Sequence, residues 1–201
     1  MNFNYEFNIF MDRTIPMRKT TQALLLLSIL ITACESQRTV FDKQVQICDL
    51  AEHKGIMETA VEACTSALEI ALSNKFSPAD QSLALYKLAS LKRKQSDYVE
   101  AESLLKKSIT IEEQKKSPSE LQLGHRLLEL SLSLAGQGRW DEGSKMLQRL
   151  LPIAKQFSDK ERTITVNILK HYAVQLKQIR QTELAMMFED QAKKMIDEHP
   201  Y

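Results

Sequence analysis

A spacing of 41 or 42 residues recurs along the chain after about position 40. Three series of positions share these intervals: Gly55, Ser96, Gly138 and Arg180; Ala60, Ala101, Gly143 and Ala185; Ala67, Ser108, Leu150 and Ala192. A sequence that repeats at such a period folds as stacked units, because no unit can bury its apolar face alone. The chain is therefore expected to be a repeat protein, a class that builds recognition surfaces more often than catalytic centres.

Apolar residues at helical spacing fill residues 41–198, and only short breaks interrupt them. Breaks of this length join antiparallel neighbours. We therefore expect an all-α protein of eight helices in four hairpins, with units at about 41–77, 78–118, 119–158 and 159–198.

Two units carry the same pattern of large and small residues. Leu-x-x-Leu-Ala or Leu-x-x-Leu-Ser lies in the first helix, and an aromatic residue after the turn precedes a small residue by three positions, over Leu85–Ala101 and Leu127–Gly143. The pattern resembles the tetratricopeptide repeat (TPR), and its period resembles the long variant of kinesin light chains and related bacterial proteins. The resemblance implies an α-solenoid in which Tyr98 and Trp140 plug the hairpins.

The first 33 residues have the composition of an export signal. Arg18 and Lys19 precede an apolar run over 23–31, and small residues follow. That run is shorter than the roughly 18 residues that a membrane-spanning helix needs. Residues 31–34, Ile-Thr-Ala-Cys, resemble the lipobox of bacterial lipoproteins, which implies cleavage after Ala33 and a lipid on Cys34. The alternatives are an uncleaved anchor and a plain secretory signal in which Cys34 is incidental.

The lipoprotein resemblance also implies a location. Glu35 follows the cysteine where inner-membrane retention would need Asp, which favours an outer-membrane lipoprotein that faces the periplasm. Residues 34–40 would be the lipidated cysteine and a polar tether, and a start at Met17 would give a more compact leader. A cytoplasmic scaffold with a misread N-terminus is the alternative.

Charge excludes one class of partner. Without residues 1–33, the remaining 168 residues hold 24 basic and 24 acidic side chains. A nucleic-acid-binding domain would show a clustered basic excess, and membrane attachment without a polybasic patch would rest on the lipid alone.

No arrangement of residues indicates catalysis, a cofactor, a metal site or a small-molecule substrate. His53, His125, His171 and His199 lack partners at metal-binding spacing. Cys48 and Cys64 lie on opposite helices of the first hairpin, and they either form a structural disulfide or pack as small buried residues. Their positions suggest an offset of about one turn, which disfavours the bond because a disulfide needs Cα atoms within about 7 Å.

The TPR resemblance implies a peptide-binding groove lined by the first helix of each unit. The matching residues are Asp42, Val45, Asp49 and Glu52 in unit one; Tyr86, Ser90 and Arg93 in unit two; His125, Leu128 and Leu132 in unit three; and Lys170, Val174 and Lys177 in unit four. Such a groove would run from acidic through mixed and apolar to basic. Leu128 and Leu132 suit an apolar anchor from a partner, and the two lysines suit acidic groups.

These features predict a lipid-anchored periplasmic adaptor, not an enzyme, that binds a peptide or helix of an envelope protein. The alternative is a regulatory or immunity-type protein that sequesters one specific enzyme. A hydrolase or transferase on this scaffold is disfavoured, because the repeats occupy nearly the whole chain after the leader.

Overall fold

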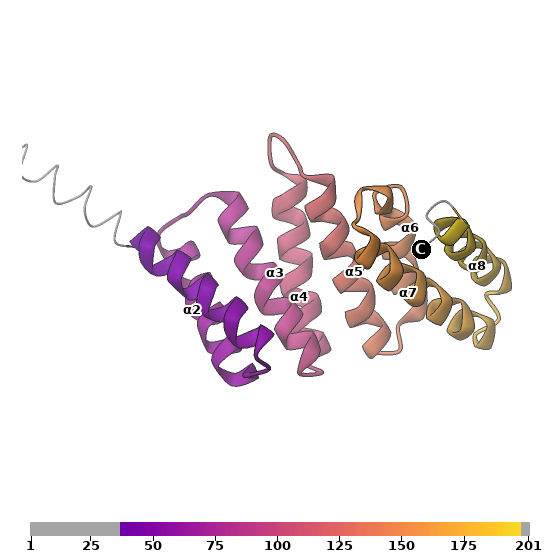
Figure 1. Cartoon of the computed structure of the whole chain (residues 1–201), viewed down its shortest axis with the longest axis horizontal. Helices are drawn as coiled ribbons and strands as arrows, with labels where there is room; N and C mark the ends of the chain where they lie inside the picture. Colours follow the sequence, from indigo (N-terminus) through magenta and orange to yellow (C-terminus); the bar gives the residue numbers. More distant parts are fainter. Residues whose placement is uncertain (1–36, 198–201) are drawn as a thin grey trace, which may run out of the picture. The chain divides into compact units, whose positions relative to one another are not determined.

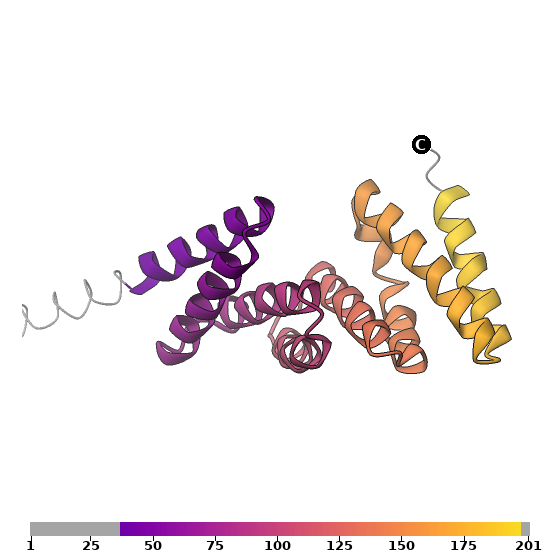
Figure 2. The same cartoon turned by 90° about the horizontal axis from the view of Figure 1, so that it is seen from below.

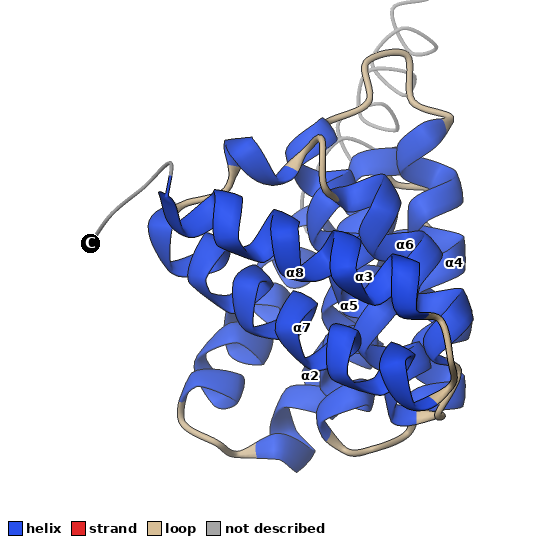
Figure 3. Ribbon diagram, turned by 90° about the vertical axis from the view of Figure 1, so that its right-hand side faces the viewer, coloured by secondary structure: helices blue, strands red, loops and turns tan. Residues whose placement is uncertain are grey.

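The computed structural model describes residues 37–197 (Figure 1). This part of the chain consists of helices joined by turns, with no strand among them (Figure 3). A first helix over residues 37–53 precedes α2 (Met57–Ser73), α3 (Pro78–Lys94), α4 (Tyr98–Glu113), α5 (Glu120–Gly136), α6 (Trp140–Leu150), the 3-10 turn η1 (Ala154–Gln156), α7 (Asp159–Gln178) and α8 (Thr182–Asp197).

Consecutive helices form hairpins that stack in chain order. Helix α3 packs on α4, α5 on α6 and α7 on α8, and α2 with α3 and α4 with α5 join successive hairpins. The pairing of α7 with α8 is visible in Figure 2. This arrangement confirms the predicted all-α solenoid of four hairpins.

The four recurrent turn positions share one backbone conformation. Gly55, Ser96, Gly138 and Arg180 have φ values of 73°, 65°, 73° and 64°. At the third turn, the Gly138 amide donates to the Ala135 carbonyl and the Arg139 amide to the Leu134 carbonyl, and the other three turns repeat these bonds. This is the Schellman motif, which ends a helix with one left-handed residue. The period of the sequence is thus a period of helix stops.

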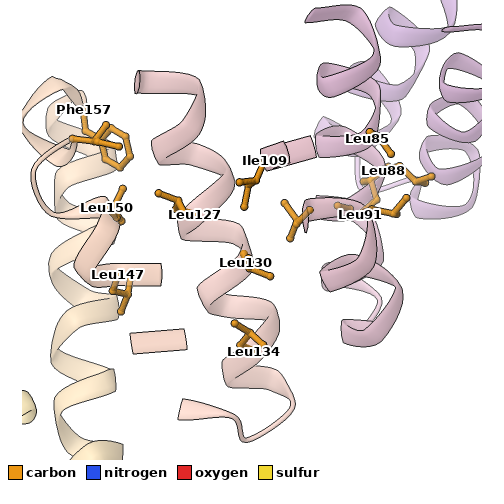
Figure 4. Packing of buried hydrophobic residues seen from close by; sticks show 14 of the residues in the cluster. Leu85, Leu88, Leu91, Ile109, Leu127, Leu130, Leu134, Leu147, Leu150 and Phe157 are labelled. Atoms are coloured by element: carbon orange, nitrogen blue, oxygen red, sulfur yellow. The ribbon is translucent and has the colours of Figure 1, made fainter. Parts of the chain in front are cut away.

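A continuous core runs through the stacked hairpins. Leu85, Leu88, Leu127, Leu130 and Leu147 all have less than 5% of their surface exposed (Figure 4). The recurrent small positions are buried too, with Ala60, Ala101 and Ala185 at 0% exposure. Small side chains at these positions let paired helices approach closely.

Tyr98 and Trp140 differ from the roles that the resemblance implied. Both rings are half-buried, and each reaches the first helix of the next unit instead of only plugging its own hairpin. The Tyr98 ring covers Gly136 so closely that a Cβ there would lie 2.4 Å from Cε1. Trp140 packs edge-on against Tyr172, with 5.1 Å between ring centroids. The two aromatic residues therefore join units as well as hairpins.

Cys48 and Cys64 form a disulfide, with 5.3 Å between their Cα atoms. The expected one-turn offset is wrong. Each cysteine lies eight positions from Ile56, the residue between the first helix and α2, so antiparallel pairing places the two opposite each other. Both side chains are buried.

Two boundaries also differ from the prediction. Residues 37–40, expected in a polar tether, are helical, because no Gly or Pro interrupts the turn that leads to the buried Phe41. The second helix of unit three ends at Leu150, since Pro152 lacks the amide hydrogen that a longer helix would need.

The leader over 1–33, Met17, Cys34 and His199 lie outside the described residues. Within residues 37–197, no helix is both long enough and apolar enough to cross a membrane.

A buried arginine fastens unit two to unit three. Arg126 of α5 is 1% exposed, and its Nε donates to Ser108 Oγ at 2.8 Å and to Ser82 Oγ at 3.0 Å. Its guanidinium also lies 5.2 Å from the centre of the Tyr86 ring. A buried cation is tolerated only with such partners, and we assign the network a structural role.

Candidate functional site

The predicted groove residues lie where the first helices of neighbouring units meet. At the first junction, Asp49 pairs with Lys87 of α3 and Glu52 pairs with Lys94 of the same helix. The expected acidic beginning of the groove is therefore corrected: lysines of the next unit neutralise these carboxylates. Asp42 is exposed, and Val45 packs partly buried against the core.

The second junction is also closed by an ion pair. The Arg93 guanidinium donates to both carboxylate oxygens of Glu129, through Nε at 2.6 Å and Nη2 at 3.3 Å. Tyr86 and Ser90 beside it are half-buried. Burial, together with the charge of Glu129, raises the pKa of Tyr86 to about 12. A bidentate pair of this kind holds α3 against α5.

The third junction, between α5 and α7, contains an apolar hollow of about 280 Å³. Its walls are formed by Leu132, Ala135, Ile164, Asn167, Ile168, His171 and Tyr172. Ala135 and His171 each lie 42 positions after the residues of the preceding ion pair, Arg93 and Glu129. The repeat thus replaces two long charged side chains by an alanine and an imidazole, and this exchange opens the space.

The floor of the hollow is rigid. Tyr172 is fully buried, and its hydroxyl donates to the Ser131 carbonyl at 2.5 Å. Burial raises the pKa of this phenol, so it stays protonated in solution. The ring packs between Trp140 and Phe188, with centroid distances of 5.1 and 6.3 Å. A floor fixed in this way is preorganised to receive an apolar group.

The rim is partly apolar and accessible. Ile164 is 44% exposed, Asn167 is exposed, and Leu132 is half-buried at the opposite wall. The His171 ring lies on the same side, 5.3 Å from the Trp140 ring. Apolar walls with a few polar groups at the edge are typical of binding sites.

Of the predicted residues of units three and four, Leu132 alone lines the hollow. Leu128 packs against the core, and His125 stacks on Phe157 with its Nε2 2.9 Å from Glu161 Oε1. Lys170, Val174 and Lys177 are exposed on α7 outside the hollow. Lys177 Nζ lies 2.6 Å from Glu189 Oε1, so the expected basic end of the groove is partly neutralised.

The prediction from the sequence did not include the other six wall residues. A comparison of units would have revealed two of them, since Ala135 and His171 break the charge pattern of positions 93 and 129. Within the described residues, no group of His, Cys, Asp or Glu is arranged to hold a metal ion.

Comparison with known proteins identifies the fold. No family model matches the sequence, and no curated protein matches it either. The crystal structure of MamA is similar over 94% of this chain and 98% of its own, with a TM-score of 0.61 and 13% identity. A putative kinesin light chain of Podosopora anserina with nearly identical TPR-like repeats is similar over 92% of both chains, with a TM-score of 0.61 and 14% identity. The chain therefore has the fold of a TPR-like α-solenoid.

Proposed function

We propose that this protein is a protein-interaction adaptor that holds an apolar side chain of its partner in the hollow between α5 and α7. The observation that carries the proposal is the loss of the ion pair at this junction. The first two junctions use their charged side chains to bind the neighbouring unit, whereas the third presents an open apolar wall. The solenoid fold supports this proposal, because helical repeats commonly bind proteins.

We further propose that a lipid on Cys34 anchors the protein to the outer membrane, facing the periplasm, and that the partner is an envelope protein. The sequence Ile-Thr-Ala-Cys over residues 31–34 supports the lipid. The disulfide between Cys48 and Cys64 supports an exported location, because disulfides persist in oxidising compartments.

The hollow is tested by substitution and crosslinking in native membranes. A photo-crosslinking amino acid at Asn167 is expected to capture a discrete partner, and the same group at Lys107 on α4 is the control. Ile164→Asp should reduce that capture about tenfold or more, since burial of one apolar side chain contributes about 1.5–3 kcal/mol. Val99→Asp is the matched control, because Val99 is 70% exposed and lies on α4. Equal capture by the Ile164 and Val99 variants would exclude the hollow as the binding site.

The anchor has a separate test. Labelled palmitate should enter the wild-type protein but not the Cys34→Ala variant, and only the variant should leave the membrane fraction. Incorporation by both proteins, or by neither, would remove the lipid from the proposal and leave the hollow untouched.

A further inference from the structure

A second cavity lies apart from the hollow between α5 and α7. It has a volume of about 360 Å³ and is bounded by the turn after α6, the beginning of α7 and the last two turns of α8. Its walls combine two kinds of side chain: apolar Leu151, Pro152, Ala154 and Met195, and polar Lys155, Arg162, Gln191 and Lys194. The early end of α6 at Pro152 brings the turn to this position.

Arg162 is the central polar group of this cavity. Its side chain is 14% exposed, its Nη1 donates to the Phe157 carbonyl at 2.6 Å, and its Nη2 pairs with Asp159. Its Nε is buried and has no hydrogen-bond partner. A buried donor without an acceptor is destabilising and calls for an explanation, such as a ligand or a water.

The charge of the cavity favours an anion. Lys155 and Lys194 add two ammonium groups to the guanidinium of Arg162, whereas Asp159 supplies the carboxylate recorded on that guanidinium. The wall residues include no acidic side chain. Guanidinium and ammonium groups bind carboxylates by charge-assisted hydrogen bonds.

We propose that this cavity binds a carboxylate attached to an apolar group, such as the C-terminal carboxylate of a peptide that ends in an apolar residue. The cations would hold the carboxylate, and Leu151, Pro152 and Met195 would surround the apolar group. The volume lies at the lower end of the range for ligand pockets, which suits one residue and its terminus. The site is independent of the hollow between α5 and α7.

The test uses the full-length chain with methyl-labelled methionine and small probes. N-acetyl-leucine carries the carboxylate and the apolar group, N-acetyl-leucinamide lacks the charge, and inorganic phosphate lacks the apolar group. Titration with N-acetyl-leucine should shift the methyl resonance of Met195, in the cavity wall, and leave that of Met57, in α2, unchanged. The amide and phosphate should each bind about tenfold more weakly or less.

Variants distinguish the site from general attraction of anions. Arg162→Gln should weaken N-acetyl-leucine binding about tenfold. Lys155→Gln should weaken it severalfold without touching the hydrogen bond to Phe157, so it serves if the first variant does not fold. Lys107→Gln removes an exposed charge on α4 and should have no effect. Equal binding of acid and amide, equal binding of acid and phosphate, or an unshifted Met195 resonance would each overturn the proposal.

Discussion

The hydroxyl oxygen of Tyr172 occupies the space that a side chain at Gly143 would need, since a Cβ at residue 143 would lie 2.0 Å from it. The other three units have alanine at the position of Gly143. Unit three differs because the tyrosine of the next unit reaches across the junction to the Ser131 carbonyl. The glycine and the tyrosine therefore form a matched pair that sets the floor of the α5–α7 hollow.

Gly143→Ala is expected to lower the free energy of unfolding by about 1–3 kcal/mol, because the added methyl group overpacks the junction. Helix propensity alone would predict a gain of about 1 kcal/mol, so the sign of the change is diagnostic. Urea unfolding measures it. In a double-mutant cycle with Tyr172→Phe, the double variant should lose less than the sum of the single losses. A Gly143→Ala protein more stable than wild type would contradict the close contact.

Ser96→Gly is expected to raise the free energy of unfolding by about 1 kcal/mol, because glycine adopts a φ of 65° without the steric cost that serine incurs. Gly138→Ala should lower it by a similar amount. Gln95→Gly is the matched control, since Gln95 has a φ of −81° and should gain nothing. Thermal and urea unfolding of the three variants give the comparison, and a stabilising Gln95→Gly would argue against a role for the left-handed turn.

Glu102 should make the protein sensitive to acid. Burial alone would raise its pKa, but hydrogen bonds from Lys106, Gln137 and Arg139 lower it from 4.5 to about 2. The unfolded chain therefore takes up the proton first, and the stabilisation is complete above pH 4.5 and is lost as the pH falls towards 2. The shift corresponds to about 3 kcal/mol as an order of magnitude.

The measurement is urea unfolding at pH 6 and pH 3 for wild type and Glu102→Gln. The variant should be less stable at pH 6, and its stability should fall less between the two pH values. Identical pH dependence in both proteins would show that Glu102 does not carry the effect.

Loss of the disulfide is expected to cost about 3 kcal/mol, as the loop between Cys48 and Cys64 spans 16 residues. The Cys48→Ala/Cys64→Ala variant should unfold at a lower urea concentration, and a reductant should destabilise wild type but not the variant. If the reductant affected both proteins equally, the disulfide would not be the cause.

Most of the fold was predictable from the sequence. The period of 41 or 42 residues is a backbone property, since each turn position is left-handed, and it identifies all four hairpins. The end of α6 at Leu150 was missed although Pro152 is visible, because the repeat favoured a helix as long as those of the other units. The disulfide was disfavoured because pairing was estimated from the repeat pattern and not from the distance of each cysteine to the turn.

The candidate site was less predictable. Positions on the first helices were correctly expected to be important, but whether they face a partner or a neighbouring unit depends on which charges meet. Asp49 and Glu52 could be assigned to a groove only while Lys87 and Lys94 were not known to lie opposite. The hollow arises from the joint absence of charge at positions 135 and 171, which is a property of two units and not of one motif.

The covalent link in the first hairpin makes the two ends of the molecule unequal. In a linear stack, an interior hairpin is held from both sides and a terminal hairpin from one, so opening begins at an end. With Cys48 and Cys64 joined, the end formed by α7 and α8 should be the one that frays. A ligand seated between α5 and α7 would close this weaker end, and occupancy and order there would increase together.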